Sequence, residues 1–283
     1  KLPFAATDIT GSIKADIGAV FSLEKAHNPP QPAWDVTLAL ADVGLKQPLQ
    51  GRKISNVDAS VTIDTQTAVL KGTADIDGTA FEVGLTEPFM KGPDSHRKWQ
   101  IEGDLSEREI LKLAPSLDGY VGGTVGLSIS SDNDAEHKAK LALTRAEISV
   151  PIFGWRKGAG VPASAELTVK KEGDQYKVSK LDISGDGFGA RGDMVIDGKG
   201  VVSARLDRVK LSTADNFAIS LQRKSAGLAI NVTGEAIDLR PFLSLIKSPS
   251  EPSVQKNQTS HTITASLDRA IGFNKETLSA IDL

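Results

Sequence analysis

Residues 58–64 read Asp-Ala-Ser-Val-Thr-Ile-Asp, and residues 80–86 read Ala-Phe-Glu-Val-Gly-Leu-Thr. In both stretches an apolar side chain alternates with a polar or small one. Because successive side chains of a β-strand point to opposite faces, this period of two predicts strands with one apolar and one polar face. Such strands are typical of antiparallel sheets that bury one face and expose the other to water.

The same alternation recurs along most of the chain, at residues 124–130, 141–143, 165–169, 217–221, 228–232 and 263–267. Asp77-Gly78 and Asp197-Gly198 each separate two alternating stretches, which predicts tight hairpins. Longer polar hairpin ends are expected at Glu172–Asp174 and Ser131–Asp134. We therefore predict a mainly β fold built as a long antiparallel β-meander.

Two short segments have helical patterns. Ser106-Glu-Arg-Glu109 is a capping box ahead of an apolar stretch, and Asp238 is expected to cap a second helix with Pro241 in its first turn. Each segment follows a strand, so the chain resembles two degenerate repeats of a β-meander plus a helix. The predicted divisions are residues 1–118 and 119–248 for the repeats, 249–262 for a flexible linker, and 263–283 for the start of a further, truncated repeat.

Composition excludes several function classes. The 283 residues contain no cysteine, which excludes disulfide scaffolds, thiol nucleophiles and cysteine-ligated metal centres. Lys+Arg 33 against Asp+Glu 36 gives a net charge of −3, too balanced for a surface that neutralises nucleic-acid phosphates. No run of about eighteen apolar residues could span a bilayer. The chain begins at Lys1 and stops within a strand pattern, so we expect a piece of a longer protein.

No motif in the sequence points to catalysis or metal binding. Gly187–Gly192 matches G-x-G-x-x-G, but a strand pattern follows it, which favours a glycine-rich turn or bulge over a dinucleotide site. The acidic stretch Asp132–His137 lacks the glycine and the distal Glu of a calcium loop. The four histidines lie in polar loops without metal-ligand spacing. We therefore expect no enzyme activity, no cofactor and no metal.

Three segments carry a resemblance to a known family: Leu141–Gly158, Gly78–Val83, and Ile237–Leu243, which reads Ile-Asp-Leu-Arg-Pro-Phe-Leu. They resemble the AsmA-like proteins of Gram-negative bacteria, more narrowly the YhdP-type branch with its domain of unknown function and AsmA-like C-terminal region. The resemblance extends from about Trp34 to Leu283. It rests on sequence pattern and carries over no catalytic residues.

This resemblance implies a periplasmic body anchored in the inner membrane by a helix outside the present chain. It also implies repeated β-meanders curled into an open, taco-like groove with an aliphatic lining. The implied ligand is a phospholipid or another acyl-chain molecule that moves between the inner and outer membranes, in support of outer-membrane integrity. Contact with the outer membrane would follow, and no nucleic acid would be bound.

The residues themselves leave two arrangements open. A sheet with one apolar face must cover that face, either by packing on a second sheet or by curling around an apolar ligand. A closed β-sandwich acting as a structural or interaction module is the commoner outcome from periodicity alone, whereas the 5% aromatic content and the resemblance favour the groove. The candidate groove-lining residues are Val61, Ile63, Leu70, Phe81, Val83, Leu85, Val125, Leu127, Ile129, Leu141, Leu143, Leu167, Val169, Ile219, Leu221, Ile230 and Val232.

Overall fold

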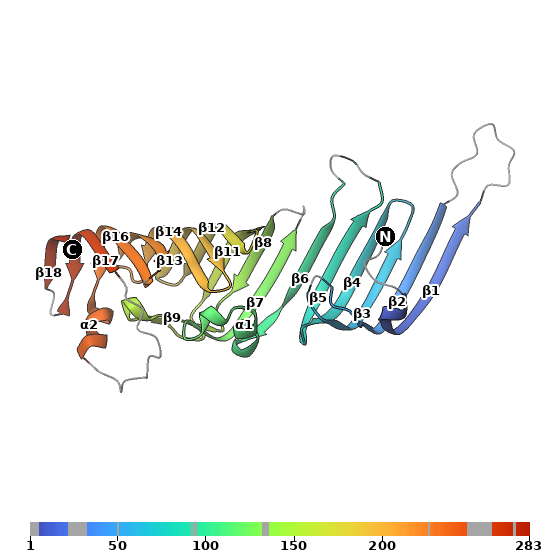
Figure 1. The fold of residues 1–283 in the computed structure, drawn as a ribbon, viewed down its shortest axis with the longest axis horizontal. Helices are drawn as coiled ribbons and strands as arrows, with labels where there is room; N and C mark the ends of the chain where they lie inside the picture. The colour runs from blue at the N-terminus through green and yellow to red at the C-terminus, as the bar shows by residue number, and fades with distance from the viewer. Residues whose placement is uncertain are drawn as a thin grey trace. The chain divides into compact units, whose positions relative to one another are not determined.

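The computed structural model describes residues 6–21, 33–49, 51–90, 92, 95–131, 136–225, 227–247, 262–273 and 276–283. The fold is mainly β, with 72% of residues in strands. Within the described residues, eighteen strands belong to one mixed sheet that stays open, and two α-helices accompany it (Figure 1). The predicted fold class is confirmed.

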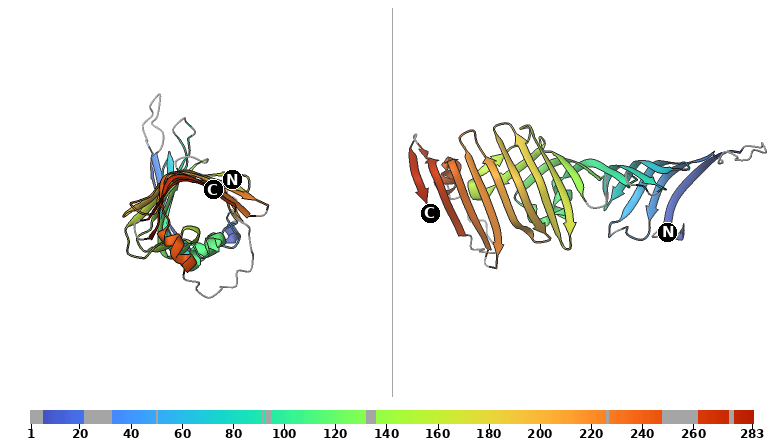
Figure 2. Two further views of the ribbon diagram at one scale, coloured as in Figure 1. Left: turned by 90° about the vertical axis from the view of Figure 1, so that its left-hand side faces the viewer. Right: turned by 90° about the horizontal axis from the view of Figure 1, so that it is seen from above.

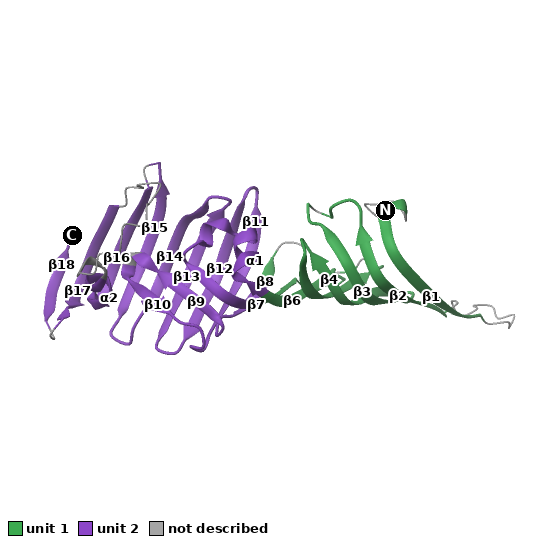
Figure 3. Ribbon diagram, turned by 90° about the horizontal axis from the view of Figure 1, so that it is seen from below, with its two compact units in different colours: residues 1–104, 127–137 green, residues 105–126, 138–283 purple. Residues whose placement is uncertain are grey.

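The chain divides into two compact units, residues 1–104 with 127–137 and residues 105–126 with 138–283 (Figure 3). The first unit contains β1 (Ile9–Val20), β2 (Ala33–Leu45), β3 (Ile54–Ile63), β4 (Thr67–Ile76), β5 (Thr79–Pro88), most of β6 (Lys98–Ser106) and part of β7 (Val121–Ser131). The second unit contains the ends of β6 and β7 that are not in the first, α1 (Glu107–Leu113), and β8 (His137–Ala142) apart from His137. It also contains β9 (Ala146–Val150), β10 (Trp155–Lys157), β11 (Ala163–Glu172), β12 (Gln175–Gly185), β13 (Phe188–Asp197), β14 (Gly200–Lys210), β15 (Asn216–Lys224), β16 (Gly227–Asp238), α2 (Arg240–Lys247), β17 (Thr262–Ile271) and β18 (Thr277–Asp282).

The predicted repeat boundaries at residues 118 and 248 follow the helices rather than these units, and they remain predictions. The proposed linker 249–262 lies, except for Thr262, outside the described residues. The strand expected from residue 263 is β17. Three short 3₁₀ helices complete the described elements: η1 (Ala6–Asp8), η2 (Pro115–Leu117) and η3 (Pro151–Phe153).

In the first unit, β1 to β6 pair consecutively and antiparallel. The β4–β5 hairpin turns at Asp77 and Gly78, whose φ angles of 53° and 81° are both left-handed. This is the geometry of a type I′ turn, which matches the twist of the flanking strands, so the predicted hairpin is confirmed. Hairpins also join β11 to β12 and β13 to β14 as predicted. Apart from Ser131, the turn expected at Ser131–Asp134 lies outside the described residues.

In the second unit, β11 to β16 form an antiparallel series, and β17 then pairs parallel to β16. We predicted antiparallel pairing throughout, and this pair departs from it. The reason is α2, which lies between β16 and β17 in the chain, because parallel neighbours need a crossover connection. Seen end-on, the orange and red strands of this unit arch, and α2 lies across the open side of the arch (Figure 2, left).

Both predicted helices are present. Ser106 caps α1 as expected, and its backbone N–H and hydroxyl donate to Glu109 Oε2 at 2.8 and 2.6 Å. At α2 the cap is shifted by one residue from the prediction. The carbonyl of Leu239 accepts the first helical hydrogen bond, from Leu243 N–H at 2.8 Å, while the Asp238 carboxylate accepts from Arg240 N–H at 3.0 Å. The Asp238 side chain thus supports the first turn from one position before the cap.

Among the described residues, one cluster of buried apolar side chains lies in each unit. The core of the first unit is small and centres on Val43, Val57 and Ala74. The core of the second unit is larger and consists of Val209, Phe217, Ile230, Val232, Ile237, Leu267 and Ala270. Because the sheet is open, the closed β-sandwich considered from the sequence is not the fold of the described chain. As expected, a strand (β13) and not a helix follows the turn at Gly187.

Candidate functional site

One face of the first unit carries aligned rows of apolar side chains. Residues directly opposite one another on paired strands project to the same face of a sheet, so the strand registers identify each row. Two rows cross the unit from β2 to β6, and together they define its apolar face: Leu38, Val61, Leu70, Leu85 and Trp99 in one, and Leu40, Ala59, Gly72, Val83 and Ile101 in the other.

The row between these two belongs to the opposite face and is polar or small: Ala39, Ser60, Lys71, Gly84 and Gln100. All five members of the Leu38–Trp99 row are only half-buried. An apolar row that stays half-buried is accessible to solvent along its length. The first unit therefore presents an apolar surface that a ligand can cover.

The second unit has the same arrangement with deeper burial. Two apolar rows cross it: Leu181, Gly192, Leu206, Ile219, Val232 and Ala265 in one, and Ile183, Ala190, Val209, Phe217, Gly234, Leu267 and Ile281 in the other. The exposed fractions of Val209, Phe217 and Val232 are 2%, 2% and 3%. This apolar face of the second unit is therefore better covered than that of the first.

A cavity of about 270 Å³ lies between α2 and this apolar face. Its lining comes from several segments: Phe153 and Trp155 from η3 and β10, Ile230 and Val232 from β16, Phe242 from α2, and Ile263, Ala265 and Leu267 from β17. The volume is slightly below the range of about 300–1,000 Å³ that is usual for small-molecule sites. A cavity of this size and composition can accept part of an apolar chain.

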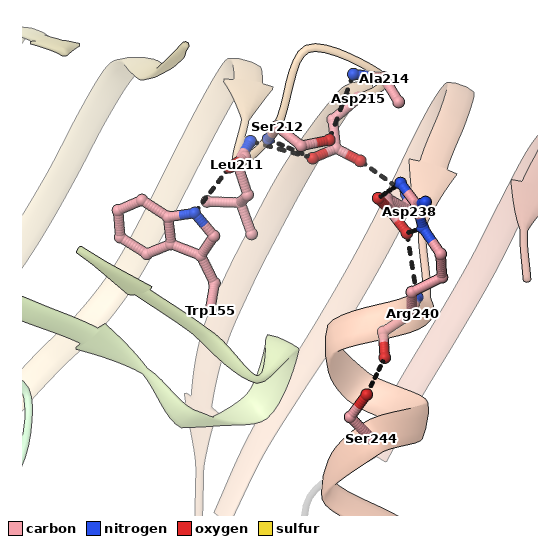
Figure 4. Close-up of polar contacts among 8 residues, drawn as sticks. All are labelled: Trp155, Leu211, Ser212, Ala214, Asp215, Asp238, Arg240 and Ser244. Atoms are coloured by element: carbon pink, nitrogen blue, oxygen red, sulfur yellow. Dashed lines mark hydrogen bonds and ion pairs between the residues drawn. The ribbon is translucent and has the colours of Figure 1, made fainter. Parts of the chain in front are cut away.

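The polar groups at the edge of this cavity are already hydrogen-bonded (Figure 4). Asp215 accepts from the backbone N–H groups of Leu211 at 3.1 Å, Ser212 at 2.6 Å and Asp238 at 2.6 Å. Trp155 Nε1–H donates to the carbonyl of Leu211 at 2.6 Å. Because the Asp215 carboxylate and the Trp155 indole N–H both bind backbone groups, they hold the segments at the cavity edge in place.

Arg240 is committed to the same network. Its Nε and Nη2 donate to the Asp238 carboxylate at 2.8 and 2.5 Å. These bonds lower the pKa of Asp238 and raise that of Arg240, so both groups stay charged. A catalytic acid would need its pKa raised instead. The pair therefore fixes the start of α2. The described residues that line the cavity include no Lys, Arg or His to hold an anionic group.

Lys157 is the one buried cation among the described residues, with 3% of its surface exposed. Its ammonium donates to the carbonyl oxygens of Ala146 at 2.7 Å, Gly158 at 3.1 Å and Thr144 at 3.4 Å. Burial lowers the pKa of Lys157, because removing the ammonium from water disfavours its charge. Its three donors are all used by carbonyls, which makes Lys157 a cross-link between loop segments.

Within the described part of the chain, no three acidic, His or Cys side chains gather where they could hold a metal ion. Nor does any helix there combine the length and apolar character needed to cross a bilayer. The polar side of β13 to β17 carries a shallow depression of about 470 Å³, whose lining includes the charged side chains of Lys177, Asp193 and Arg205 beside small and apolar ones. The apolar rows and the cavity under α2 are the features suited to hold an apolar ligand.

The structure brings most of the sequence-predicted lining residues onto these faces. In the first unit, Val61, Leu70, Val83 and Leu85 belong to the two rows, Ile63 lies opposite Ala68, and Phe81 lies opposite Ala74 and is buried. In the second unit, Ile230 and Val232 line the cavity, Ile219 and Leu221 pack against the core, and Val169 lies opposite Val178.

The remaining predicted residues are placed less simply. Leu167 lies at a β-bulge between Glu166 and Thr168, where alternation no longer fixes the face. Val125 and Leu143 are buried, whereas Leu127, Ile129 and Leu141 are half-buried. The role of all these residues as ligand contacts stays a prediction.

Sequence reasoning missed the part of the cavity made by Phe153, Trp155, Phe242 and the β17 residues. The alternation of Ile263, Ala265 and Leu267 identified a strand, but only the parallel pairing with β16 places that strand on the cavity.

No family model, no curated protein and no solved structure matches this chain.

Proposed function

We propose that this chain is a periplasmic segment of an AsmA-like, bridge-type lipid-transfer protein that holds phospholipid acyl chains on its apolar faces between the inner and outer membranes. The observation that carries the proposal is the row of Leu38, Val61, Leu70, Leu85 and Trp99. It is continuous over five strands, and every member is half-buried. A continuous apolar row that remains partly accessible to solvent is a candidate binding surface.

The energetics favour an acyl chain as ligand. Each methylene removed from water contributes about 0.8 kcal/mol, so a chain lying along several strands is held without any polar contact. The rows supply aliphatic side chains in register, and the cavity under α2 adds a deeper apolar recess in the second unit. A phosphate headgroup would stay in water, because the described residues that line the cavity include two carboxylates and no cationic side chain.

Photo-crosslinking tests the proposal with neighbouring residues as matched controls. A benzophenone amino acid at Val61 or Ile219 projects from an apolar face, whereas one at Thr62 or Ser220 projects from the polar face of the same strand. Irradiation in cells of a Gram-negative bacterium should attach phospholipid to the protein at the first pair of positions and not at the second. Equal labelling of both faces would refute the proposal.

Native mass spectrometry supplies an independent test. The purified 283-residue chain should carry lipid-sized adducts that disappear after delipidation and return with added phospholipid vesicles. A chain that never carries lipid under either condition would remove the basis for the transfer role.

A further inference from the structure

We infer that the cavity under α2 is a binding site for an uncharged molecule with a flat, fused-ring body. This ligand class is distinct from the acyl chains of the proposed function. The cavity measures about 270 Å³, and all of its described lining residues belong to the second unit. The inference goes beyond the proposed function and stands whether or not acyl chains lie on the apolar rows.

Aromatic side chains gather at this cavity, although only 5% of the residues in the chain are aromatic. Phe153, Trp155 and Phe242 line it directly. Two further rings support them: Phe188 packs on Trp155 with the ring centroids 5.0 Å apart, and Phe217 packs on Phe153 with the centroids 6.0 Å apart. Aliphatic walls are sufficient to hold an acyl chain, so this concentration of rings indicates a ligand that is itself a ring system.

The aromatic wall is held in place before any ligand binds. Trp155 Nε1–H donates to the carbonyl of Leu211 at 2.6 Å, which fixes the orientation of the indole (Figure 4). Both ring pairs have centroid separations in the range that aromatic pairs favour. Phe217, on which Phe153 rests, is only 2% exposed. A flat ligand can therefore stack on this wall without first ordering its side chains, which lowers the entropic cost of binding.

The volume of the cavity suits about two fused rings. Buried cavities of about 150 Å³ that are lined by Leu, Ile and Phe side chains stay dry and bind benzene. The cavity under α2 is larger than this, and its strand side is aliphatic, with Ile230, Val232 and Leu267 among the lining residues. A rigid two-ring body can fill such a space, whereas a flexible chain of the same size loses conformational entropy when it is confined.

The charges at the cavity edge favour a ligand without charge. Asp215 and Asp238 both contribute to the lining, and its described residues include no Lys, Arg or His. An anionic ligand would therefore meet two carboxylates and no counter-charge. A cationic ligand would find carboxylates that are already engaged, Asp215 by three backbone N–H groups and Asp238 by Arg240. Burying an unpaired charge is costly in either case.

Fluorescence titration of the full chain tests the inference with two matched ligands, 2-naphthol and 1-decanol. They have the same number of non-hydrogen atoms and one hydroxyl each, but the first is a fused ring and the second a flexible chain. With Trp34→Phe and Trp99→Phe, Trp155 is the remaining tryptophan, so its emission reports occupancy of the cavity. We expect 2-naphthol to bind about threefold or more tightly than 1-decanol. A surface without ring recognition would favour 1-decanol, which has more apolar area to bury.

A third ligand tests the charge. 2-Naphthoate carries the same two rings with a carboxylate in place of the hydroxyl. At neutral pH it should bind about tenfold more weakly than 2-naphthol, because it brings a negative charge to the carboxylates of Asp215 and Asp238. Equal affinities for the two ring compounds would overturn the assignment to an uncharged ligand.

Phe153→Leu and Phe242→Leu each remove one ring from the lining while keeping it apolar. Each should weaken 2-naphthol binding by about threefold to tenfold and change 1-decanol binding by less than about twofold. Phe153→Leu also loses the contact with Phe217, whereas Phe242 is 37% exposed, so Phe242→Leu keeps the test valid if the first variant does not fold. The control is Phe89→Leu, which removes a 49% exposed ring from the first unit and should change neither affinity.

Two results would overturn the inference: tighter binding of 1-decanol than of 2-naphthol, or equal losses of both ligands in a folded Phe242→Leu variant. The proposed function is tested separately, by phospholipid capture at Val61 in the first unit. A chain that binds 2-naphthol at Trp155 but captures no phospholipid contradicts the proposed function alone. A chain that captures phospholipid but shows no preference for 2-naphthol contradicts this inference alone.

Discussion

The carboxylate of Asp215 accepts a 2.6 Å hydrogen bond from the backbone N–H of Asp238, and this contact ties the β14–β15 loop to the strand end that leads into α2. Asp215 is 4% exposed and also accepts from Leu211 and Ser212. One carboxylate thus satisfies three backbone donors at the edge of the cavity. The position of α2 over the apolar face depends on this arrangement.

Asp215→Ala should therefore destabilise the second unit. Removing the carboxylate leaves three backbone donors without their partner, and we expect the free energy of unfolding to fall by about 3 kcal/mol. Asp207→Ala is the control, because the Asp207 side chain is 65% exposed and pairs with an exposed Arg205, a contact expected to contribute less than about 1 kcal/mol. Urea denaturation of both variants measures the difference, and equal losses would contradict the prediction.

The Asp238–Arg240 pair should make the free energy of unfolding depend on pH in the acid range. Arg240 lowers the pKa of Asp238 below its ordinary 3.8, so the folded state binds the proton less readily than the unfolded state. The stabilisation is therefore present above pH 3.8 and is lost as the pH falls through the folded pKa. Arg240→Gln should be less stable than wild type at neutral pH, and the two stability curves should converge in acid.

Chemical denaturation across the acid range measures this convergence. Arg205→Gln serves as its control, since the Arg205 side chain is 82% exposed and its loss should shift the curve little at any pH. A constant gap between Arg240→Gln and wild type down to the lowest pH would show that Arg240 acts through packing instead.

The strands and hairpins were predictable because they depend on local pattern. Alternation over a few residues identifies a strand, and Asp77-Gly78 specifies a type I′ turn through backbone conformation alone. The two helices were predictable for the same reason, since a capping residue and a short apolar stretch define each of them. The one-residue shift at α2 reflects Asp238 engaging Arg240 from outside the cap position.

The cavity was not predictable because it depends on contacts between distant segments. Trp155 reaches the carbonyl of Leu211, which is 56 residues away, and no local pattern encodes that distance. The parallel pairing of β17 with β16 likewise depends on where α2 and the intervening chain return. The β-bulge at Leu167 shows the same limit on a smaller scale, because one extra residue breaks the alternation from which its face was inferred.

Two interior glycines of the first unit should respond to alanine with opposite signs. A Cβ added at Gly72 would collide with the carbonyl oxygen of Asp58 and lie 2.5 Å from Ala59 Cα, so the backbones of β3 and β4 would have to separate. At Gly84, on the neighbouring strand, nothing lies within 4 Å. We expect Gly72→Ala to lower the free energy of unfolding by about 1–3 kcal/mol.

Gly84→Ala should be neutral or stabilising by up to about 1 kcal/mol, because alanine restricts the unfolded chain without meeting a neighbour. Thermal and urea denaturation of the two variants give the comparison. If both substitutions destabilised the protein equally, the close approach of β3 and β4 at Gly72 would not be the cause.

Filling the cavity under α2 should show whether an apolar ligand binds there or on the apolar face of the first unit. Ala265 lines the cavity and lies opposite Val232, so a phenyl ring at this position would occupy part of the 270 Å³. Ala265→Phe should weaken the binding of a fluorescent apolar probe, N-phenyl-1-naphthylamine, at this site by about tenfold. Ala218→Phe on the opposite face of β15 adds the same ring outside the cavity and should leave this affinity unchanged, as Ala218 is registered with Thr233 on the polar side. A probe affinity that survives Ala265→Phe with the fold intact would assign binding to the half-buried rows of the first unit instead.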